Sequence, residues 1–311
     1  MGIGELAYTD PRRAPVKPPA HATIVVLEDW PRREALYFIP TSEHAIALAI
    51  ELHGSGLDPL RQYQMSRLAD RLTASGIAVL LPQAATPFQL MPEVGYGFAW
   101  NIPGVPLPSS TELSNADDIG YITQLVESFQ QKLQLCDAPL FLSGYSGGAR
   151  LASYMLASGH LKWTAAGLVA GLRPIEHGQR PPPPTISFHG VADTINPFEG
   201  GLGPRWDIGV EEAGDRFALA QGCTPDPQEF QLPGADVHIY RLPDGAAALS
   251  MYTVVGAAHA WPGTRDEDHL KIFGPAGDNL NASSLIEKFF VSRMTPTMQR
   301  NVEPGMHGSP R

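Results

Sequence analysis

Short apolar runs alternate with segments of helical periodicity along most of the chain. The runs have the length and composition of buried strands, and they lie at residues 45–52, 77–81, 140–142, 167–170, 185–188 and 251–255. Apolar residues recur with helical spacing at residues 60–75, 117–135, 147–158, 210–220 and 282–290. Strands that alternate with helices predict the α/β class, in which a mostly parallel sheet carries helices on both faces.

Two stretches break this alternation and set the expected domain organisation. Residues 82–116 and 194–207 show no clear period, and the first of them is rich in proline, glycine and aromatic residues. Long irregular stretches within a compact domain are usually functional, so we expect cap-like loops at the rim of a binding cleft. Plain surface insertions are the alternative. The pattern as a whole predicts one domain over residues 23–294, between loose tails at residues 1–22 and 295–311.

The composition is that of a globular protein. Of 311 residues, 43% are hydrophobic and 17% are charged, which is not the profile of a disordered chain. The net charge of −10 disfavours nucleic acid and anionic membrane surfaces as partners, because both require a basic face. The N-terminal segment lacks the apolar run of a signal peptide, and no apolar stretch approaches the roughly 20 residues of a membrane span. We therefore expect a soluble protein, for which a cytoplasmic location is favoured over a secreted mature form, and leave its compartment and its oligomeric state open.

Metal and cofactor chemistry finds no support in the sequence. Cys136 and Cys223 are the cysteines of the chain, and two cysteines cannot supply the spacing of a zinc or iron–sulfur site. They form either one disulfide or two free thiols. We expect neither a metal nor a cofactor. The sequence also shows no cluster of arginine and lysine residues that would indicate a phosphorylated substrate.

A serine flanked by glycines stands at a predicted strand–helix junction. Residues 144–148 read Gly-Tyr-Ser-Gly-Gly, with Ser146 at the centre. Such a match is weak by itself, but this one follows an apolar run and precedes a helical pattern. A strand, a sharp turn and a helix are the setting of a nucleophile elbow, which presents the serine hydroxyl at the strand end. Ser146 is therefore the candidate nucleophile, and the N-terminus of the following helix favours negative charge beside it.

A serine hydroxyl needs a neighbouring base to act as a nucleophile, and histidine is the expected base. On this type of sheet the base follows the last strand. His259 fits, because it comes in a loop after the apolar run at residues 251–255. His269 is the fallback, although its charged surroundings are more typical of a solvated face. His53 and His189 each precede a glycine at a strand end, and we interpret them as structural or cleft-lining residues.

The third member of such a triad is a carboxylate that orients the histidine. It should follow the strand after the nucleophile unit, which the sequence places at residues 185–188. Asp193 lies in the loop after this strand, and Asp207 is the runner-up. An isolated aspartate in a loop is usually a turn or cap residue, but the position of Asp193 between the candidate nucleophile and base favours the catalytic interpretation.

The negative oxygen that forms during acyl transfer needs two N–H donors about 3 Å away. One would be the backbone N–H of Gly147, directly after the nucleophile. The other should come from the loop after an early strand, where residues 53–56 read His-Gly-Ser-Gly. Ser55 is the expected second donor of this oxyanion hole. An ordinary glycine-rich turn is the alternative interpretation of the loop.

Six pieces of the chain also match motifs of a known family: residues 52–54, 116–122, 143–150, 189–193, 206–223 and 258–263. Through them the chain resembles the secreted esterases that group polyhydroxybutyrate depolymerases with feruloyl and acetylxylan esterases. The resemblance spans roughly residues 45–290, and it implies the α/β-hydrolase fold with Ser146, Asp193 and His259 as the triad. The chain departs from the family in having no visible signal peptide, and in carrying Ser55 where many members have a cysteine.

The sequence thus predicts a serine esterase that cleaves a small-molecule or polymer-derived ester through an acyl-enzyme. Exposed aromatic residues near the triad would stack on a sugar, a phenolic acid or a polyester chain; packing in the core is the alternative. The residues expected to contact substrate are Trp100, Asn101, Tyr145, Trp206 and Trp261. An acyltransferase or lyase, a peptidase and a non-catalytic binding protein on the same fold are the other candidate functions.

Overall fold

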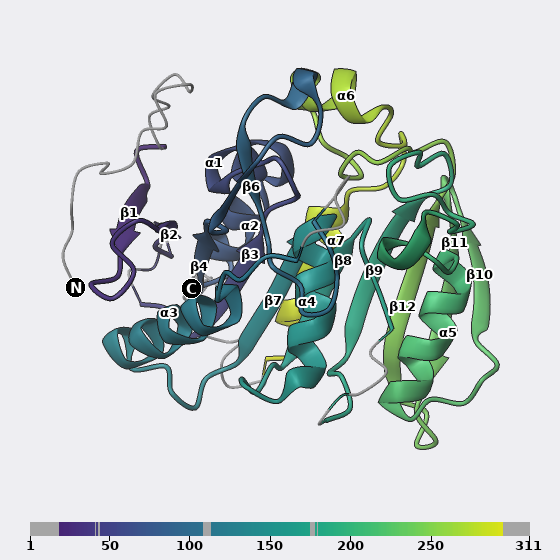
Figure 1. The fold of residues 1–311 in the computed structure, drawn as a ribbon. Coiled ribbons are helices and arrows are strands. Elements are labelled where there is room, and N and C mark those ends of the chain that lie inside the picture. The colour runs from purple at the N-terminus through teal and green to yellow at the C-terminus, as the bar shows by residue number, and fades with distance from the viewer. Residues whose placement is uncertain are drawn as a thin grey trace, which may run out of the picture.

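The computed structural model describes residues 19–40, 42, 44–107, 113–174, 178 and 180–294 (Figure 1). Most of the two tails expected at the ends of the chain, residues 1–18 and 295–311, lies outside the described residues. Residues 19–22 of the expected N-terminal tail are described, and the first strand, β1 (Ala22–Val26), begins at the last of them.

A ten-stranded sheet forms the centre of the molecule, with strand order β1-β2-β4-β3-β7-β8-β9-β12-β11-β10. The strands from β4 to β12 in this order run parallel to one another, and they are the strands that the apolar runs predicted. Their bounds are β3 (Ala47–Leu52), β4 (Ile77–Pro82), β7 (Leu140–Tyr145), β8 (Ala165–Val169), β9 (Thr185–Gly190) and β12 (Ala247–Val254).

Antiparallel strands extend both edges of the sheet, and the sequence pattern did not reveal them. β1 and β2 (Glu34–Phe38) close one edge, while β10 (Gln228–Leu232) and β11 (Ala235–Arg241) close the other. All five residues of β10 are exposed, and buried and half-buried residues are mixed along β11. Strands of this kind carry polar side chains on their solvated face, so they contain no continuous apolar run to recognise.

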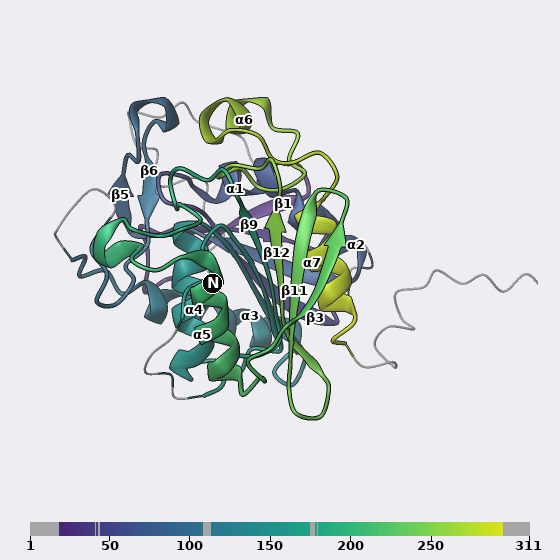
Figure 2. The same cartoon turned by 90° about the vertical axis from the view of Figure 1, so that its right-hand side faces the viewer.

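Helices cover both faces of the sheet, as the strand–helix alternation predicted (Figure 2). One face is covered by α3 (Asp118–Leu133), α4 (Gly147–Ser158) and α5 (Val210–Gln221), whose apolar residues join one core cluster. The other face is covered by α1 (Pro59–Ser66), α2 (Leu68–Ala74) and α7 (Ala282–Val291), whose apolar residues join a second cluster. The short helix α6 (Glu267–Phe273) lies above the carboxyl ends of the strands (Figure 2). The sheet therefore has a buried layer on each side.

The expected single helix at residues 60–75 is two helices, α1 and α2. The break is at Arg67, whose φ of 50° and ψ of 23° place it in the left-handed region. Its backbone N–H caps α1 by donating to the carbonyl of Tyr63. The apolar spacing continues across the break, which is why the sequence pattern did not show it.

Both irregular stretches contain short ordered elements. Residues 82–116 hold a small hairpin of β5 (Thr86–Phe88) and β6 (Gly97–Ala99), with a 3₁₀ turn η1 (Pro92–Val94) between the two strands. Residues 194–207 hold the 3₁₀ turn η2 (Gly203–Arg205). These elements are too short to show a period in the sequence.

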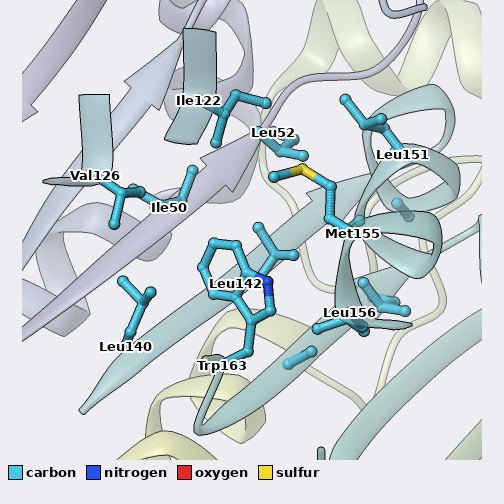
Figure 3. Packing of buried hydrophobic residues seen from close by; sticks show 14 of the residues in the cluster. Ile50, Leu52, Ile122, Val126, Leu140, Leu142, Leu151, Met155, Leu156 and Trp163 are labelled. Carbon is cyan, nitrogen blue, oxygen red and sulfur yellow. The ribbon is translucent and has the colours of Figure 1, made fainter. Parts of the chain in front are cut away.

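The core next to α4 fixes this helix on the sheet. Leu142 of β7, Ile50 of β3 and Met155 of α4 are fully or almost fully buried, and Trp163 packs with them (Figure 3). Interlocked packing of this kind resists small displacements, because protein interiors hold few voids. The N-terminus of α4, where the candidate nucleophile stands, is therefore held in a defined place relative to β7.

No helix within the described part of the chain combines the length and the apolar character that crossing a bilayer requires.

Candidate active site

Ser146 occupies a sharp turn between β7 and α4. Its φ of 52° and ψ of −115° are unusual for a residue with a side chain. The turn requires a glycine two residues later, because a Cβ on Gly148 would lie 2.4 Å from the carbonyl oxygen of Leu52. Glycine thus lets α4 approach the end of β3. This strand–turn–helix geometry is that of a nucleophile elbow.

His259 reaches Ser146 from a loop more than a hundred residues away in the chain. The loop follows β12, and the Nε2 atom of His259 lies 2.9 Å from the Ser146 Oγ. The Nδ1 atom lies 2.6 Å from Oδ2 of Asp193, in the loop after β9. Because the carboxylate accepts the proton on Nδ1, Nε2 is free to accept the serine proton. All three side chains are buried.

Asp193 is held as a carboxylate by its neighbours. Its Oδ1 atom accepts hydrogen bonds from the backbone N–H groups of Ile195 and Asn196, both at 2.8 Å. Burial tends to raise the pKa of Asp193. The attraction and hydrogen bond to His259, the attraction to His189 and the hydrogen bond from the Asn196 N–H act in the opposite direction. Together they outweigh burial, so the pKa of Asp193 lies below its usual value. The carboxylate therefore remains charged and can orient His259.

No protein-family model matches the chain. In sequence it is 25% identical over 239 residues to the "Putative esterase NocK" of Nocardia uniformis subsp. tsuyamanensis, a match that covers 70% of this chain and 65% of that protein. It is 27% identical over 129 residues to the "Probable feruloyl esterase C" of Aspergillus niger, covering 40% of this chain and 43% of that protein. The chain thus spans less than two thirds of either curated relative.

Among solved structures, the apo form of Thermogutta terrifontis esterase 2 is similar with a TM-score of 0.53 and 15% identity. The match covers 91% of this chain and 99% of that one. Agreement over nearly both whole chains, together with the elbow at Ser146, decides the fold. The chain has the α/β-hydrolase fold. The relatives that it resembles in sequence are named esterases.

The loop after β3 faces the turn at Ser146. A Cβ on Gly147 would lie 3.2 Å from the backbone nitrogen of Ser55, so the two residues are in close contact. The loop is fixed by His53, whose carbonyl accepts from Trp100 Nε1 at 2.7 Å and whose Nε2 accepts from the Ala84 N–H at 3.1 Å. Within the described residues no hydrogen bond from the backbone N–H of Ser55 or Gly147 is found. Both donors are therefore available at the elbow.

The aromatic residues expected to be exposed substrate contacts are buried instead, and that expectation is wrong. Trp100, Trp206 and Trp261 are 3%, 1% and 1% exposed. The indole N–H of each residue donates a hydrogen bond within the protein. Trp206 donates to the carbonyl of Pro197 at 2.7 Å and Trp261 to Ser283 Oγ at 2.9 Å, while Trp100 donates to the carbonyl of His53. Trp100 braces the loop after β3, while Trp206 and Trp261 brace the loops of Asp193 and His259.

The two remaining predicted contact residues also bond to backbone. The hydroxyl of the buried Tyr145 donates to the carbonyl of His259 at 2.8 Å. The side-chain amide of Asn101, which is partly exposed, donates to the carbonyl of Ala116 at 2.6 Å. Tyr145 thus connects the elbow directly to the loop of the candidate base, a contact that the sequence did not reveal.

The alternative histidines lie close to the triad without replacing it. His189 stacks on Trp206 with ring centroids 5.6 Å apart, and its Nε2 donates to the carbonyl of Asn196 at 2.8 Å. Burial lowers its pKa to about 4, so it is neutral at neutral pH. His269 accepts from the backbone N–H of Trp261 at 3.3 Å, and burial lowers its pKa to about 3. Both are structural neighbours of the triad.

The alternative acid, Asp207, and the two cysteines lie outside the candidate active site. Asp207 lines a separate cavity among arginines. Cys136 is exposed and Cys223 is buried, and both are free thiols. Among the described residues, no group of three His, Cys, Asp or Glu side chains is arranged to hold a metal ion.

The arginines of that cavity were missed by sequence reasoning, which found no basic cluster. Arg150, Arg173, Arg205 and Arg216 come from four separate segments, so no local run of charge signals them. The fold alone brings them together.

Proposed function

We propose that this α/β-hydrolase is a serine esterase that hydrolyses carboxylic esters with Ser146, His259 and Asp193. The observation that carries the proposal is the continuous chain of hydrogen bonds from Ser146 through His259 to Asp193 at a nucleophile elbow. Activation of a serine requires this arrangement, because the hydroxyl must lose its proton as it attacks. The sequence relatives named esterases support the ester as the bond that is cleaved.

The first half of the reaction forms an acyl-enzyme. Ser146 Oγ attacks the ester carbonyl while His259 Nε2 takes its proton, and the carbonyl oxygen becomes an oxyanion. His259 then gives this proton to the leaving alcohol as the ester C–O bond breaks. In the second half, water attacks the acyl-enzyme with His259 again as base, and the carboxylic acid and free Ser146 are released. Asp193 stabilises the positive charge that His259 carries in each half.

The backbone N–H groups of Ser55 and Gly147 are the proposed oxyanion hole. Both belong to segments whose backbone is fixed by neighbouring contacts, so the donors need no rearrangement when charge develops. The N-terminus of α4 adds a favourable partial positive charge at the same place.

The substrate class follows from similarity more than from contacts. Resemblance to polyhydroxybutyrate depolymerases and feruloyl esterases points to a small-molecule or polymer-derived ester. We further propose that residues 23–294 act as a single catalytic domain in which the stretches near 82–116 and 194–207 shape the entrance to the site.

The test compares wild type with Ser146→Ala and Ser292→Ala on simple p-nitrophenyl esters, methyl ferulate, acetylated xylan and hydroxybutyrate oligomers. Ser292 is exposed at the end of α7, where its hydroxyl donates to the carbonyl of Phe289, and it controls for loss of a serine hydroxyl. We expect kcat to fall by roughly 10³-fold or more for Ser146→Ala, because the remaining groups only bind and polarise the ester. Full activity of a folded Ser146→Ala variant would overturn the proposal.

A further inference from the structure

A cavity of about 530 Å³ lies along α4, outside the triad. Its volume is within the range of small-molecule sites. Four arginines line it, and Asp207 is the one carboxylate among its described lining residues. Because the whole chain carries a net charge of −10, this concentration of positive charge is a local feature. The arginines are Arg150, Arg173, Arg205 and Arg216.

Three of these arginines have buried nitrogen atoms without a hydrogen-bond partner among the described residues. Arg150 is only 5% exposed; one of its terminal nitrogens donates to the carbonyl of Arg205 at 2.6 Å, while its Nε has no partner. Arg173 donates to the carbonyl of Ile208 at 2.9 Å, leaving Nε and one terminal nitrogen without partners. Arg205 likewise has two such nitrogens. Buried donors of this kind are costly unless a ligand accepts from them.

The positions of the guanidinium groups are electrostatically unfavourable, because the groups are buried and repel one another. Burial lowers the pKa of Arg150 most strongly, and the positive charges of Arg205 and Arg173 lower it further. The guanidinium of Arg173 lies over the ring of Trp206, with its central carbon 3.2 Å from the ring centroid. This stacking fixes the direction of its donors. A bound anion would supply acceptors for the free donors and would offset the repulsion among the arginines.

Two elements link the cavity to the candidate triad. Arg150 lies in the first turn of α4, where its backbone N–H donates to the carbonyl of Ser146 at 3.0 Å. Trp206, whose ring lies under the Arg173 guanidinium, stacks on His189. His189 in turn lies next to Asp193. Ile102, Val105 and Tyr154 add apolar wall to the same cavity.

We propose that this cavity binds an oxyanion carried by the ester substrate, a carboxylate or phosphate group, with Arg150, Arg173 and Arg205 as its donors. The inference rests on the proposed esterase function and narrows its substrate to esters with an anionic group a few atoms from the scissile bond. The apolar wall would contact the chain that joins the two groups. The sequence showed no cluster of arginine and lysine residues, because the arginines of this site come from separate segments and their positive charge is local.

The experiment compares each anionic ester with a neutral ester of the same length. Mono-p-nitrophenyl esters of succinate, glutarate and adipate are paired with the p-nitrophenyl esters of the corresponding unbranched monocarboxylic acids. For wild type we expect kcat/KM to be at least tenfold higher for the best anionic ester than for its neutral partner, since charge-assisted hydrogen bonds are the strong ones. Succinate and inorganic phosphate, added as competitors, show which oxyanion the site prefers.

The variants Arg173→Gln and Arg205→Gln should reduce the anionic-to-neutral ratio by tenfold or more, and Arg173→Lys should restore part of it. Arg241→Gln removes one positive charge on the distant strand β11, and it should leave the ratio unchanged. Thermal unfolding of each variant verifies that it is folded. A folded variant with an unaltered ratio contradicts the assignment of that arginine.

The outcomes separate the two proposals. If wild type hydrolyses neutral esters but shows no preference for anionic ones, and neither succinate nor phosphate competes, the anion site is overturned and the esterase function stands. If wild type hydrolyses no ester, while calorimetry shows succinate or phosphate binding that Arg173→Gln removes, the esterase function is overturned and the binding site stands apart from it.

Discussion

At the scale of single residues, the candidate site depends on how a few buried polar atoms are satisfied. Asp193 uses one oxygen for two backbone N–H groups and the other for His259, so its orientation is fixed before any substrate binds. The Nε2 atom of His189 lies 3.3 Å from Oδ2, the same oxygen that faces His259. Preorganised groups of this kind need not rearrange as charge develops.

The sequence pointed to Ser146, Asp193 and His259 as a candidate triad, whose side chains lie together in the structure, but it did not point to their neighbours. Ser146, Asp193 and His259 each follow a recognisable strand, and the order of strands on a parallel sheet decides which loops meet. The burial of Trp100 depends on contacts with residues far away in the chain, so its sequence position gives no information on exposure. The same reason hid the bond from Tyr145 to the base loop.

Glu51 provides a residue-scale prediction. It lies in β3, where Oε1 accepts from Gln62 Nε2 at 2.8 Å and Oε2 has no partner among the described residues. Burial raises its pKa from 4.5 to about 7. Because the pKa of Glu51 is higher in the folded state than in the unfolded state, its contribution to the free energy of unfolding is fully present below about pH 4.5. This contribution is lost as the pH rises through 7. Glu51→Gln removes the buried charge, so its stability relative to wild type should increase by about 3 kcal/mol between pH 4.5 and 8.

Urea unfolding of wild type and Glu51→Gln at pH 5 and pH 8 measures this difference. Glu127→Gln, at an exposed position of α3, serves as the matched control for loss of a carboxylate and should show no comparable change. An equal gap between wild type and Glu51→Gln at both pH values would contradict the raised pKa of Glu51.

At the scale of elements, apolar periodicity predicted the parallel strands and most helices, and it failed where an element is short or half-exposed. β10 has no buried residue, and the hairpin of β5 and β6 has three residues in each strand. Apolar spacing also does not register a single backbone angle, which is why the break between α1 and α2 at Arg67 was unforeseen.

A helix end supplies the element-scale prediction. α3 ends at Gln134, whose φ of 58° and ψ of 40° are left-handed, and whose exposed side chain makes no hydrogen bond within the described residues. Glycine adopts this conformation without the steric cost that a Cβ carries. Gln134→Gly should therefore stabilise the protein by about 0.5–1 kcal/mol, measured by urea unfolding.

The control is the same substitution three residues earlier. Gln131 is exposed in the last turn of α3, where its backbone is helical. Gln131→Gly should destabilise the protein by up to about 1 kcal/mol, because glycine is a poor residue within a helix. Destabilisation by both substitutions would show that the cap of α3 is not strained.

At the scale of the whole molecule, the parallel sheet brings the candidate catalytic residues together at the carboxyl ends of its strands. The loop of Ser55 follows β3, Ser146 follows β7, and the loops of Asp193 and His259 follow β9 and β12, which are neighbours in the sheet. This gathering could be predicted, because the carboxyl ends of parallel strands share one edge. The cavity of arginines could not be predicted, because its members come from α4, from the loop after β8, from η2 and from α5.

The central claim is that the fold makes Ser146 the activated nucleophile. Its most direct test is labelling of the native protein with a fluorophosphonate probe, followed by mass spectrometry of the intact chain and its peptides. The account predicts one adduct per chain, located on Ser146, formed much more slowly by His259→Gln and absent after thermal unfolding. An adduct on another serine, or no adduct on a folded protein that still cleaves esters, would contradict it.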